Sequence, residues 1–279
     1  MRIFYLISSL KIGGAEVALA NLLPGIQAKG HTCTVAYFHD GPIRARIEAL
    51  GITTIKISGP FHHYDPWAII RLFRSIKQFN PDILHTSLWS ANIIGRILGK
   101  LLKIPVASDL HGNCLFEGRI RNWGDRLTAR WSTATIAVSD GVAAAYKTLC
   151  PATAPTLITI KNGIDASALQ TRATATPLSR SELGIPETAF IVGSVGRLEN
   201  IKGYELLVRA CAAIPNNPTR PLWLCIVGDG SCKSDLVRLA SELGIADRVL
   251  LTGFRNDAFR FYRIFDCFAL SSFSPRVRR

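Results

Sequence analysis

Short apolar runs alternate with longer amphipathic segments along almost the whole chain, and this alternation constrains the fold more than any single motif. Runs typical of buried strands precede segments of helical apolar spacing at 3–7, 32–38, 83–86, 106–109, 134–138, 190–195, 222–227 and 249–252. Strands that are joined by helices pair in parallel, because a parallel connection needs a long crossover. We therefore predict an α/β protein with two doubly wound, Rossmann-like domains that face a cleft.

A change in composition predicts the domain boundary. Residues 166–187 are rich in Ala, Thr, Ser and Arg, contain Pro177 and Pro186, and hold few large apolar side chains. Such a segment is typical of a linker. We predict an N-terminal domain at 1–165, a linker at 166–187 and a C-terminal domain at 188–279.

Charge and cysteine usage narrow the partners and the compartment. The net charge of +13 over 279 residues predicts an anionic partner: nucleotide phosphates, a membrane leaflet or nucleic acid. The 7 cysteines include no C-x-x-C pair, which favours a reducing compartment over a disulfide or zinc framework. Ser8, Ser9 and Lys11 interrupt the first apolar run, so no signal peptide is evident, and no apolar stretch is long enough to span a bilayer. We expect a cytoplasmic protein; peripheral contact with the inner membrane face stays open.

Two cations lie between the strand at 190–195 and the helix that follows it. Arg197 comes just after the strand, and Lys202 and Gly203 come where the helix begins. Ligands bind at the carboxyl ends of parallel strands, and helix N-termini attract phosphate. Arg and Lys together suit a diphosphate. The alternative is a surface turn with two solvated cations.

Three residues of the N-terminal half are candidate site residues, because they too follow predicted strands. Gly13 and Gly14 follow the first strand and permit close approach of a polar group, or they form a plain tight turn. The G-x-G-x-x-G spacing is absent, so a dinucleotide fingerprint is not predicted. His111 follows the strand at 106–109, where a histidine is well placed for chemistry; a structural histidine is the alternative.

Two predicted helices of the N-terminal half combine cations with aliphatic residues. In the helix at 66–78, with Asp65 as N-cap and Pro66 first, the cations lie on one side and apolar residues on another: Arg71, Arg74 and Lys77 against Trp67, Ile70 and Phe73. The helix at 90–102 carries Arg96 and Lys100 among aliphatics. These helices either face anionic lipid or pack on the core with solvated outer faces.

Eight short strings, in order along nearly the whole chain, carry a family resemblance. They read KIGGAE, DLHG, AVSDGV, KNGID, VGRLENIKG, CIVGDG, LLTGFRND and DCFALSSFS. The series resembles the retaining glycosyltransferases with the two-domain GT-B fold, and more narrowly the "glycosyltransferase group 1" branch, family four, that builds bacterial envelope polysaccharides. Each string alone is weak evidence, whereas the ordered series is specific.

The resemblance implies roles for residues at matching positions. Gly13 and Gly14 match the glycine loop that approaches the donor phosphate and sugar, and His111 matches the histidine near the transferred sugar. The donor-binding residues implied in the C-terminal half are Arg197, Lys202, Gly203, Asp229, Gly230, Phe254 and Arg255. In the family, the first two neutralise the diphosphate leaving group and the last two lie against the nucleotide base.

The implied reaction moves a sugar from a nucleotide-diphosphate donor to an acceptor hydroxyl, with retained anomeric configuration. The resemblance implies a carbohydrate or lipid-linked acceptor and no cofactor. It also implies no metal, because this fold does not use the Asp-x-Asp metal site of the other common glycosyltransferase fold.

The end of the sequence departs from the family pattern. After Ser274 the family continues with Glu-Gly-Phe-Gly or similar and then a second glutamate, and this pair binds donor sugar and ribose hydroxyls. Here the chain reads Pro275-Arg-Val-Arg-Arg279. We expect a truncated second domain that lacks the glutamate pair and the closing helix; a natural basic tail is the alternative.

Three other functions are alternatives to the transferase. An inactive fragment that at most binds nucleotide diphosphate shares the same cations, so only turnover separates the two. A GT-B epimerase would form a product sugar nucleotide without an acceptor. Nucleic-acid binding rests on net charge alone and lacks a reading motif or aromatic platform, so no nucleic-acid partner is predicted.

Overall fold

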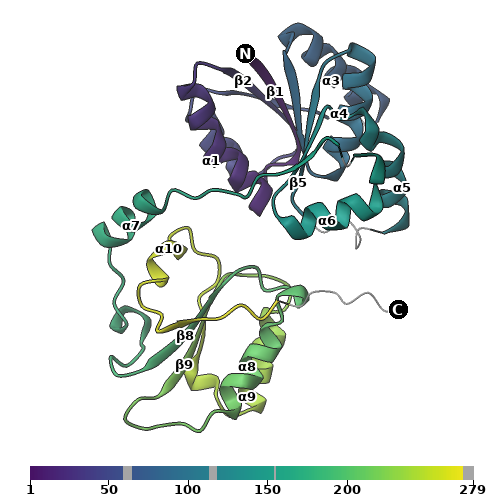
Figure 1. Ribbon diagram of the computed structural model, residues 1–279. Helices are drawn as coiled ribbons and strands as arrows, with labels where there is room; N and C mark the ends of the chain where they lie inside the picture. Colours follow the sequence, from purple (N-terminus) through teal and green to yellow (C-terminus); the bar gives the residue numbers. More distant parts are fainter. Residues whose placement is uncertain (59–64, 113–117, 154, 273–279) are drawn as a thin grey trace. The chain divides into compact units, whose positions relative to one another are not determined.

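The computed structural model describes residues 1–58, 65–112, 118–153 and 155–272, and it divides into two compact α/β units (Figure 1). Unit 1 is Met1–Ile164 and unit 2 is Asp165–Arg279. Within the described residues, each unit contains one parallel sheet. The predicted fold class, two α/β units with parallel sheets, is confirmed.

Unit 1 has a seven-stranded sheet of order β3-β2-β1-β4-β5-β6-β7. Its strands are β1 (Arg2–Ser9), β2 (Thr32–His39), β3 (Thr53–Lys56), β4 (Ile83–Ser87), β5 (Val106–Leu110), β6 (Ala134–Ala137) and β7 (Leu157–Thr159). Its helices are α1 (Gly14–Ala28), α2 (Ile43–Glu48), α3 (Pro66–Phe79), α4 (Trp89–Leu102), α5 (Arg119–Thr128) and α6 (Asp140–Leu149). The strand order reverses between β1 and β4, which is where ligands bind in open α/β sheets.

Unit 2 has a four-stranded sheet of order β10-β9-β8-β11. The elements are α7 (Ala166–Ala175), β8 (Phe190–Val195), α8 (Tyr204–Ala213), β9 (Leu222–Val227), α9 (Lys233–Glu242), β10 (Val249–Leu251), α10 (Ala258–Phe261) and β11 (Cys267–Phe268). One face of the sheet packs on α8 and α9, and the other packs on α10 and the chain before β8.

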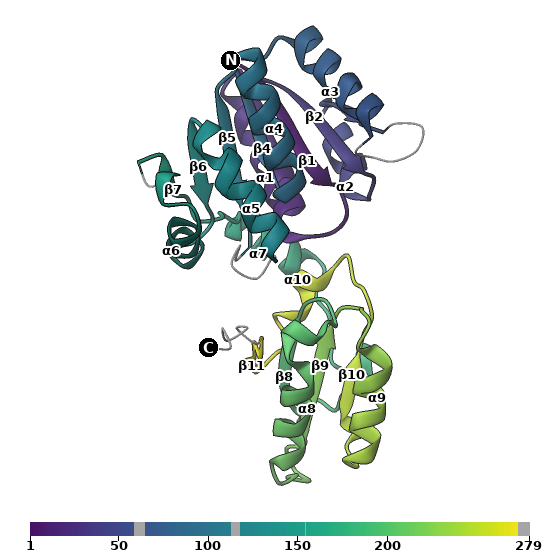
Figure 2. The same ribbon diagram turned by 90° about the vertical axis from the view of Figure 1, so that its right-hand side faces the viewer.

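Alternation along β1 explains how the sheet of unit 1 is covered on both faces. Side chains of successive strand residues point to opposite faces. Tyr5 and Ile7 pack in the cluster formed with α1 and α2, whereas Phe4 and Leu6 pack in the cluster formed with α3 and α4. Figures 1 and 2 show α1 on one side of the sheet and α3, α4 and α5 on the other.

The start of α3 agrees with the prediction, but its buried face does not. The Asp65 carboxylate accepts the backbone N–H of Ala68 at 2.8 Å, so the predicted N-cap is confirmed. The core takes Ala68, Leu72 and Ile76, which follow a spacing of four residues. Trp67 and Ile70 are 61% and 40% exposed, so the predicted apolar side of Trp67, Ile70 and Phe73 is not the side that the core takes. Small and aliphatic side chains fit the close approach of helix to sheet, and the large indole stays outside.

The segment expected as a linker, 166–187, differs from the prediction because most of it folds onto unit 2. It contains the helix α7, and the side chains of Leu178 and Ile185 are buried in the same cluster as α10. Arg260 of α10 donates hydrogen bonds to the carbonyls of Thr176 and Pro177. Burial of these apolar side chains and the two hydrogen bonds from Arg260 anchor the segment to unit 2.

Helix α10 is shorter than the predicted helix at 257–265. The chain leaves the helix after Phe261, and the ring of Phe265 packs over Gly193 of β8, where a Cβ would lie 2.1 Å from that ring. Glycine in the strand thus makes room for the aromatic ring, and this long-range contact outweighs local helix propensity.

Candidate functional site

The carboxyl ends of β8, β9 and β10 bring three loops of unit 2 together. The backbone N–H of Leu198 donates to the carbonyl of Asp229 at 2.9 Å, and that of Gly228 donates to the carbonyl of Gly253 at 3.0 Å. A Cβ on Gly228 would lie 2.0 Å from the carbonyl oxygen of Gly196, and Gly228 has φ of +148°. Only glycine permits this approach. Gly228 was not among the predicted site residues, although it begins the Gly-Asp-Gly turn.

All seven donor-side residues predicted from the sequence lie on these three loops. They are Arg197, Lys202 and Gly203 after β8, Asp229 and Gly230 after β9, and Phe254 and Arg255 after β10. Gly203 has φ of +64° and is the N-cap of α8. The unsatisfied N–H groups of a helix N-terminus therefore lie beside the two cations, which is a favourable arrangement for an anion.

The two cations after β8 have no acidic partner among the described residues. Arg197 is exposed and Lys202 is half-buried, and neither forms an ion pair there. Their charge is therefore available to a ligand. The backbone is held nearby, because the hydroxyl of Ser271 donates to the carbonyl of Lys202 at 2.9 Å.

The other predicted side chains are engaged within unit 2. The Asp229 carboxylate accepts the N–H of Gly230 at 2.9 Å and lies 3.6 Å from the Lys233 ammonium. Arg255 donates two hydrogen bonds of 2.8 Å to Asp257, and its guanidinium stacks 5.5 Å from the ring of Phe261. Phe254 is 52% exposed, which leaves its ring accessible for stacking.

The predicted glycine loop of unit 1 forms the start of α1. Gly13 is the N-cap in extended conformation, and its carbonyl accepts the N–H of Val17 at 3.0 Å. A Cβ there would lie 2.4 Å from the buried side chain of Glu16. Gly14 is exposed with open space at its Cβ position, so that a polar group can approach the helix N-terminus.

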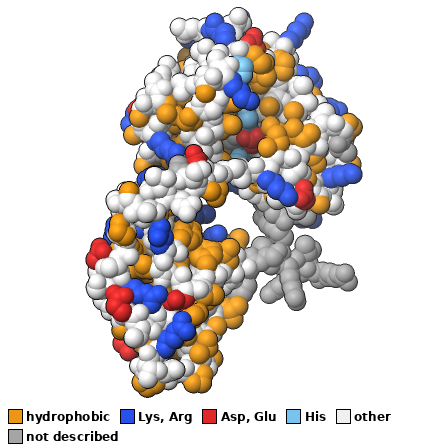
Figure 3. Space-filling model, turned by 60° about the vertical axis from the view of Figure 1, so that its left-hand side comes forward, with side chains coloured by type: hydrophobic (Ala, Val, Ile, Leu, Met, Phe, Trp, Pro, Cys, Tyr) orange, Lys and Arg blue, Asp and Glu red, His pale blue; other side chains and the backbone are white. Residues whose placement is uncertain are grey.

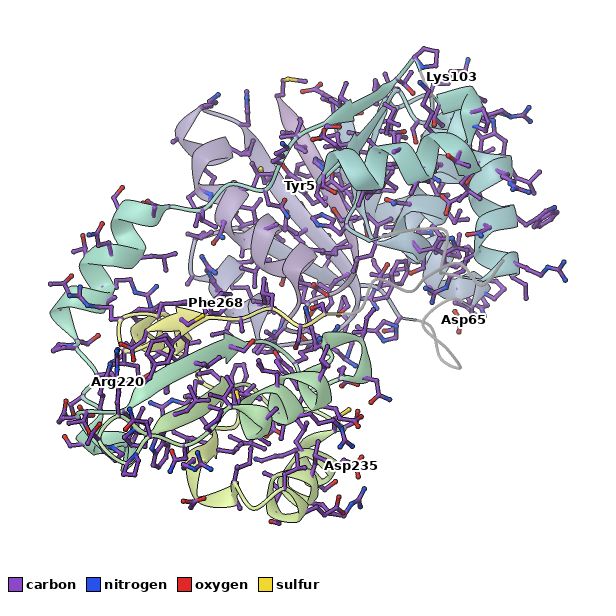
Figure 4. All side chains as sticks on the ribbon, turned by 60° about the horizontal axis from the view of Figure 1, so that its bottom comes forward. Tyr5, Asp65, Lys103, Arg220, Asp235 and Phe268 are labelled. Atoms are coloured by element: carbon purple, nitrogen blue, oxygen red, sulfur yellow. The ribbon has the colours of Figure 1, made fainter. Side chains whose placement is uncertain are left out.

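His111 follows β5 and belongs to a polar cluster that sequence analysis did not find. Asp109 Oδ2 lies 2.8 Å from His85 Nε2 and 3.8 Å from His111 Nε2, and it accepts the Ser87 hydroxyl at 3.1 Å. Histidine and acidic side chains are seen together on the face of unit 1 in Figure 3. His85 also stacks on Tyr5, which Figure 4 labels among the strands, with ring centroids 4.8 Å apart. Period-two alternation places His85 and Ser87 on one face of β4. This alternation is the sequence signal from which the cluster could have been predicted.

Arg96 does not face solvent or lipid, so its assignment to a basic outer face is wrong. It is fully buried, and its guanidinium donates to Asp125 at 2.6 Å and to the hydroxyl of Tyr146 at 3.1 Å. It also bonds the hydroxyls of Ser108 and Ser132. Nearly all its donors are thereby satisfied, which is what a buried arginine requires.

A cavity of about 530 Å³ lies between α8 and α9. Asp235 of α9, which lines it, is labelled in Figure 4. Of the predicted residues it contacts only Gly203. Its charged walls are largely paired with each other: Arg209 with Glu205, and Arg238 with Asp235 and Glu242. The cavity therefore offers no free charge comparable to Arg197 and Lys202.

Two observations concern metal and membrane. No group of three His, Cys, Asp or Glu among the described residues is arranged to hold a metal ion. Likewise, none of the helices in the described part of the chain has the length and apolar character that crossing a bilayer requires.

Comparison with known families accounts for both units. The family described as Glycosyltransferase Family 4 matches residues 12–168, and that described as Glycosyl transferases group 1 matches residues 176–274. The first match alone spans more than half of the chain. Apart from Lys11, the ordered strings found in the sequence lie within these two matches.

Curated relatives and solved structures are similar over different lengths. The lipopolysaccharide core biosynthesis glycosyltransferase LpsD of Rhizobium meliloti is 37% identical over 113 residues, 40% of this chain and 32% of the relative. The UDP-Gal:alpha-D-GlcNAc-diphosphoundecaprenol alpha-1,3-galactosyltransferase of Escherichia coli is 28% identical over 222 residues, 75% and 56% of the two chains. The structure of Anabaena HepE in complex with UDP has a TM-score of 0.80 at 23% identity, covering 99% of this chain and 75% of that one. The chain thus spans less than two thirds of the length of these curated relatives, and the structural likeness shows the fold.

Proposed function

Because the chain belongs to glycosyltransferase family 4, we propose that it transfers a sugar from a nucleotide-diphosphate donor to an acceptor hydroxyl in bacterial envelope polysaccharide or lipopolysaccharide synthesis. The anomeric configuration is retained and no metal or other cofactor takes part. The proposed acceptor is a carbohydrate or a lipid-linked saccharide. The name of the Escherichia relative gives a diphosphoundecaprenol-linked sugar for that protein, and the Rhizobium relative is named for lipopolysaccharide core biosynthesis.

The observation that carries the proposal is the pair of unpaired cations beside the N-terminus of α8. Breaking the bond between sugar and diphosphate leaves two phosphates with increased negative charge. Arg197 and Lys202 lie on one loop with no described acidic partner, so they are free to bind that charge. Preorganised positive charge at the place where negative charge develops is usually the largest contribution to such catalysis.

The remaining residues take supporting roles in the proposal. Gly203, Asp229 and Gly230 shape the loops next to the cations, and Phe254 and Arg255 bind the nucleotide base. In unit 1, His111 contacts the transferred sugar, and the loop at Gly13 and Gly14 offers backbone N–H groups to the donor.

Turnover of a labelled donor tests the function. UDP-glucose is the first donor to use, since Anabaena HepE was also solved with it. We expect transfer of labelled glucose to a lipopolysaccharide or diphosphoundecaprenol-linked acceptor, with NMR of the early product showing the donor's own anomeric configuration. Inverted product would contradict retention. Binding of UDP without any transfer or hydrolysis, across a panel of donors, would support the binding fragment instead.

We also propose that unit 1 contacts anionic membrane through the outer faces of α4 and α5, called here the α4–α5 surface. Its exposed apolar residues are Ile97, Leu101, Ile120, Trp123 and Leu127. Its exposed cations are Lys100, Arg119, Arg121 and Arg126. The single carboxylate of the two helices, Asp125, is buried, so the surface combines apolar area with positive charge alone. That combination suits an anionic lipid surface.

Flotation with liposomes checks the membrane contact. The chain is expected to float with phosphatidylglycerol-containing vesicles and not with phosphatidylcholine alone, and high salt should weaken binding. The double variant Ile120→Asp, Trp123→Asp should lose most binding, because it places negative charge at positions 82% and 65% exposed. Leu206→Asp, at a 54% exposed position on α8, is the matched control. Equal flotation of the double variant and the wild type would contradict the proposal.

A further inference from the structure

The cluster at the carboxyl end of β4 and β5 contains a carboxylate that the proposed transfer does not yet use. Asp109 side-chain oxygen Oδ2 is shared by three neighbours: His85, Ser87 and His111. The side chains of Asp109 and His111 are 17% and 10% exposed, so the cluster is largely screened from water yet open at one side.

Two imidazoles lie beside the Asp109 carboxylate, and within the described part of the chain no fixed cation does. Burial would raise the pKa of the Asp109 carboxyl, but the adjacent imidazoles of His111 and His85 hold it well below its usual range. Among the described residues no Lys or Arg forms an ion pair with it. His85 Nε2 lies 2.8 Å from Asp109 Oδ2, but the ring is not aligned for a hydrogen bond. His111 Nε2, 3.8 Å from the same oxygen, is the other imidazole nitrogen beside this carboxylate.

The side chains of β5 that pack in the interior lie on the face of the strand opposite to Asp109. Ser108 and Leu110 point into the interior, where Ser108 joins the buried Arg96 network and Leu110 packs against α6. Asp109 points the other way by alternation. Its polar contacts are therefore not part of that interior network.

We propose that Asp109 is a positioning residue for His111: it accepts the Nε2–H of the imidazole, fixes the ring orientation and leaves Nδ1 as the acceptor for a sugar hydroxyl. His85 and Ser87 in turn hold the carboxylate. A neutral imidazole has one donor and one acceptor nitrogen, so a carboxylate at one nitrogen decides what the other can do. The 3.8 Å separation shortens when substrate binds, as is common for catalytic pairs in ligand-free proteins. This inference rests on the proposed role of His111.

The first experiment does not depend on transferase activity. The protein labelled with ¹⁵N-histidine is studied by NMR at about pH 8, above the ordinary histidine pKa, with His111 assigned from a His111→Gln variant. In the wild type we expect Nε2 of His111 to be the protonated nitrogen. In Asp109→Asn, which can present an N–H instead, the tautomer should change. An unchanged His111 spectrum would overturn the proposal.

The second experiment is a double-mutant cycle on transfer. Asp109→Asn should lower kcat by about 100-fold with little change in donor KM, and it should have no further effect in a His111→Ala background. Asp140→Asn, at a surface carboxylate paired with Lys161, should transfer at the wild-type rate. An equal loss in both backgrounds would show that Asp109 does not act through His111.

The two experiments separate failure of this inference from failure of the proposed function. If His111→Ala transfers at full rate, the catalytic role of His111 is lost, while the NMR spectra still decide the contact with Asp109. If Asp109→Asn does not fold, Ser87→Ala removes one hydrogen bond to the same oxygen, and a smaller decrease in kcat with a shifted His111 spectrum is expected. No change in either would overturn the proposal.

Discussion

Replacing Arg197 by alanine is expected to lower kcat/KM for the sugar-nucleotide donor by about 10²- to 10³-fold, the usual cost of losing one preorganised group at a developing negative charge. Arg197 is exposed on the loop after β8 and makes no ion pair among the described residues, so its removal leaves the fold intact. Steady-state rates with the donor varied at fixed acceptor measure the effect.

A matched control separates this site-specific effect from general charge. Arg209→Ala removes a cation from α8 that already pairs with Glu205 at 2.9 Å, and it should leave kcat/KM unchanged. Arg197→Lys should fall between alanine and wild type, because a lysine keeps the charge but loses the planar fork. Similar losses in Arg197→Ala and Arg209→Ala would mean that long-range attraction of the donor, and not a bound diphosphate, explains the rate.

The second large effect is on stability: Asp125→Ala is expected to destabilise unit 1 by about 3–5 kcal/mol, the cost of leaving a buried charge without its partner. Arg96 is fully buried and its guanidinium lies 2.6 Å from Asp125. Burial raises the pKa of Tyr146, so that its hydroxyl stays protonated and donates to the same carboxylate at 3.0 Å. One substitution therefore disrupts contacts among α4, α5 and α6.

Urea unfolding followed by tryptophan fluorescence measures this loss, because four of the five tryptophans, Trp67, Trp89, Trp123 and Trp131, lie in unit 1. Asp235→Ala breaks a surface pair with Arg238 and should cost less than about 1 kcal/mol. The double variant Arg96→Met, Asp125→Leu should recover much of the stability, since no buried charge remains. Equal stability of Asp125→Ala and the wild type would contradict the assigned ion pair.

Most strand and helix positions were predictable from local pattern, and so was the placement of the candidate residues of unit 2 on neighbouring loops. β8 and β9 match their predicted bounds, 190–195 and 222–227, because each is a largely apolar run that is followed by a glycine, Gly196 or Gly228. Arg197 and Lys202 could be placed together since they lie on one loop. Sequence alone also places Asp229 and Phe254 near them, because parallel strands end at the same edge of a sheet.

The predictions that failed, or were not made, concern contacts between residues that are distant in the chain. Arg96 sits among aliphatics at helical spacing, and nothing nearby reveals that Asp125, 29 positions on, lies beside it. Asp109 lies inside a five-residue strand whose pattern shows the alternation but not which face carries a site. Leu178 and Ile185 have few apolar neighbours in sequence and find theirs on α10.

The position of β1 inside its sheet has a consequence for synthesis on the ribosome. β1 pairs with β2 on one side and β4 on the other. After β2 is complete, the 43 residues from Asp40 to Asp82 must be added before the second partner begins. At about 5–20 residues per second, one edge of β1, an interior strand of the finished sheet, stays unpaired for roughly 2 to 9 seconds. Its apolar residues are exposed to other chains and to chaperones during that time, so yield in cells should depend on how quickly this stretch is translated.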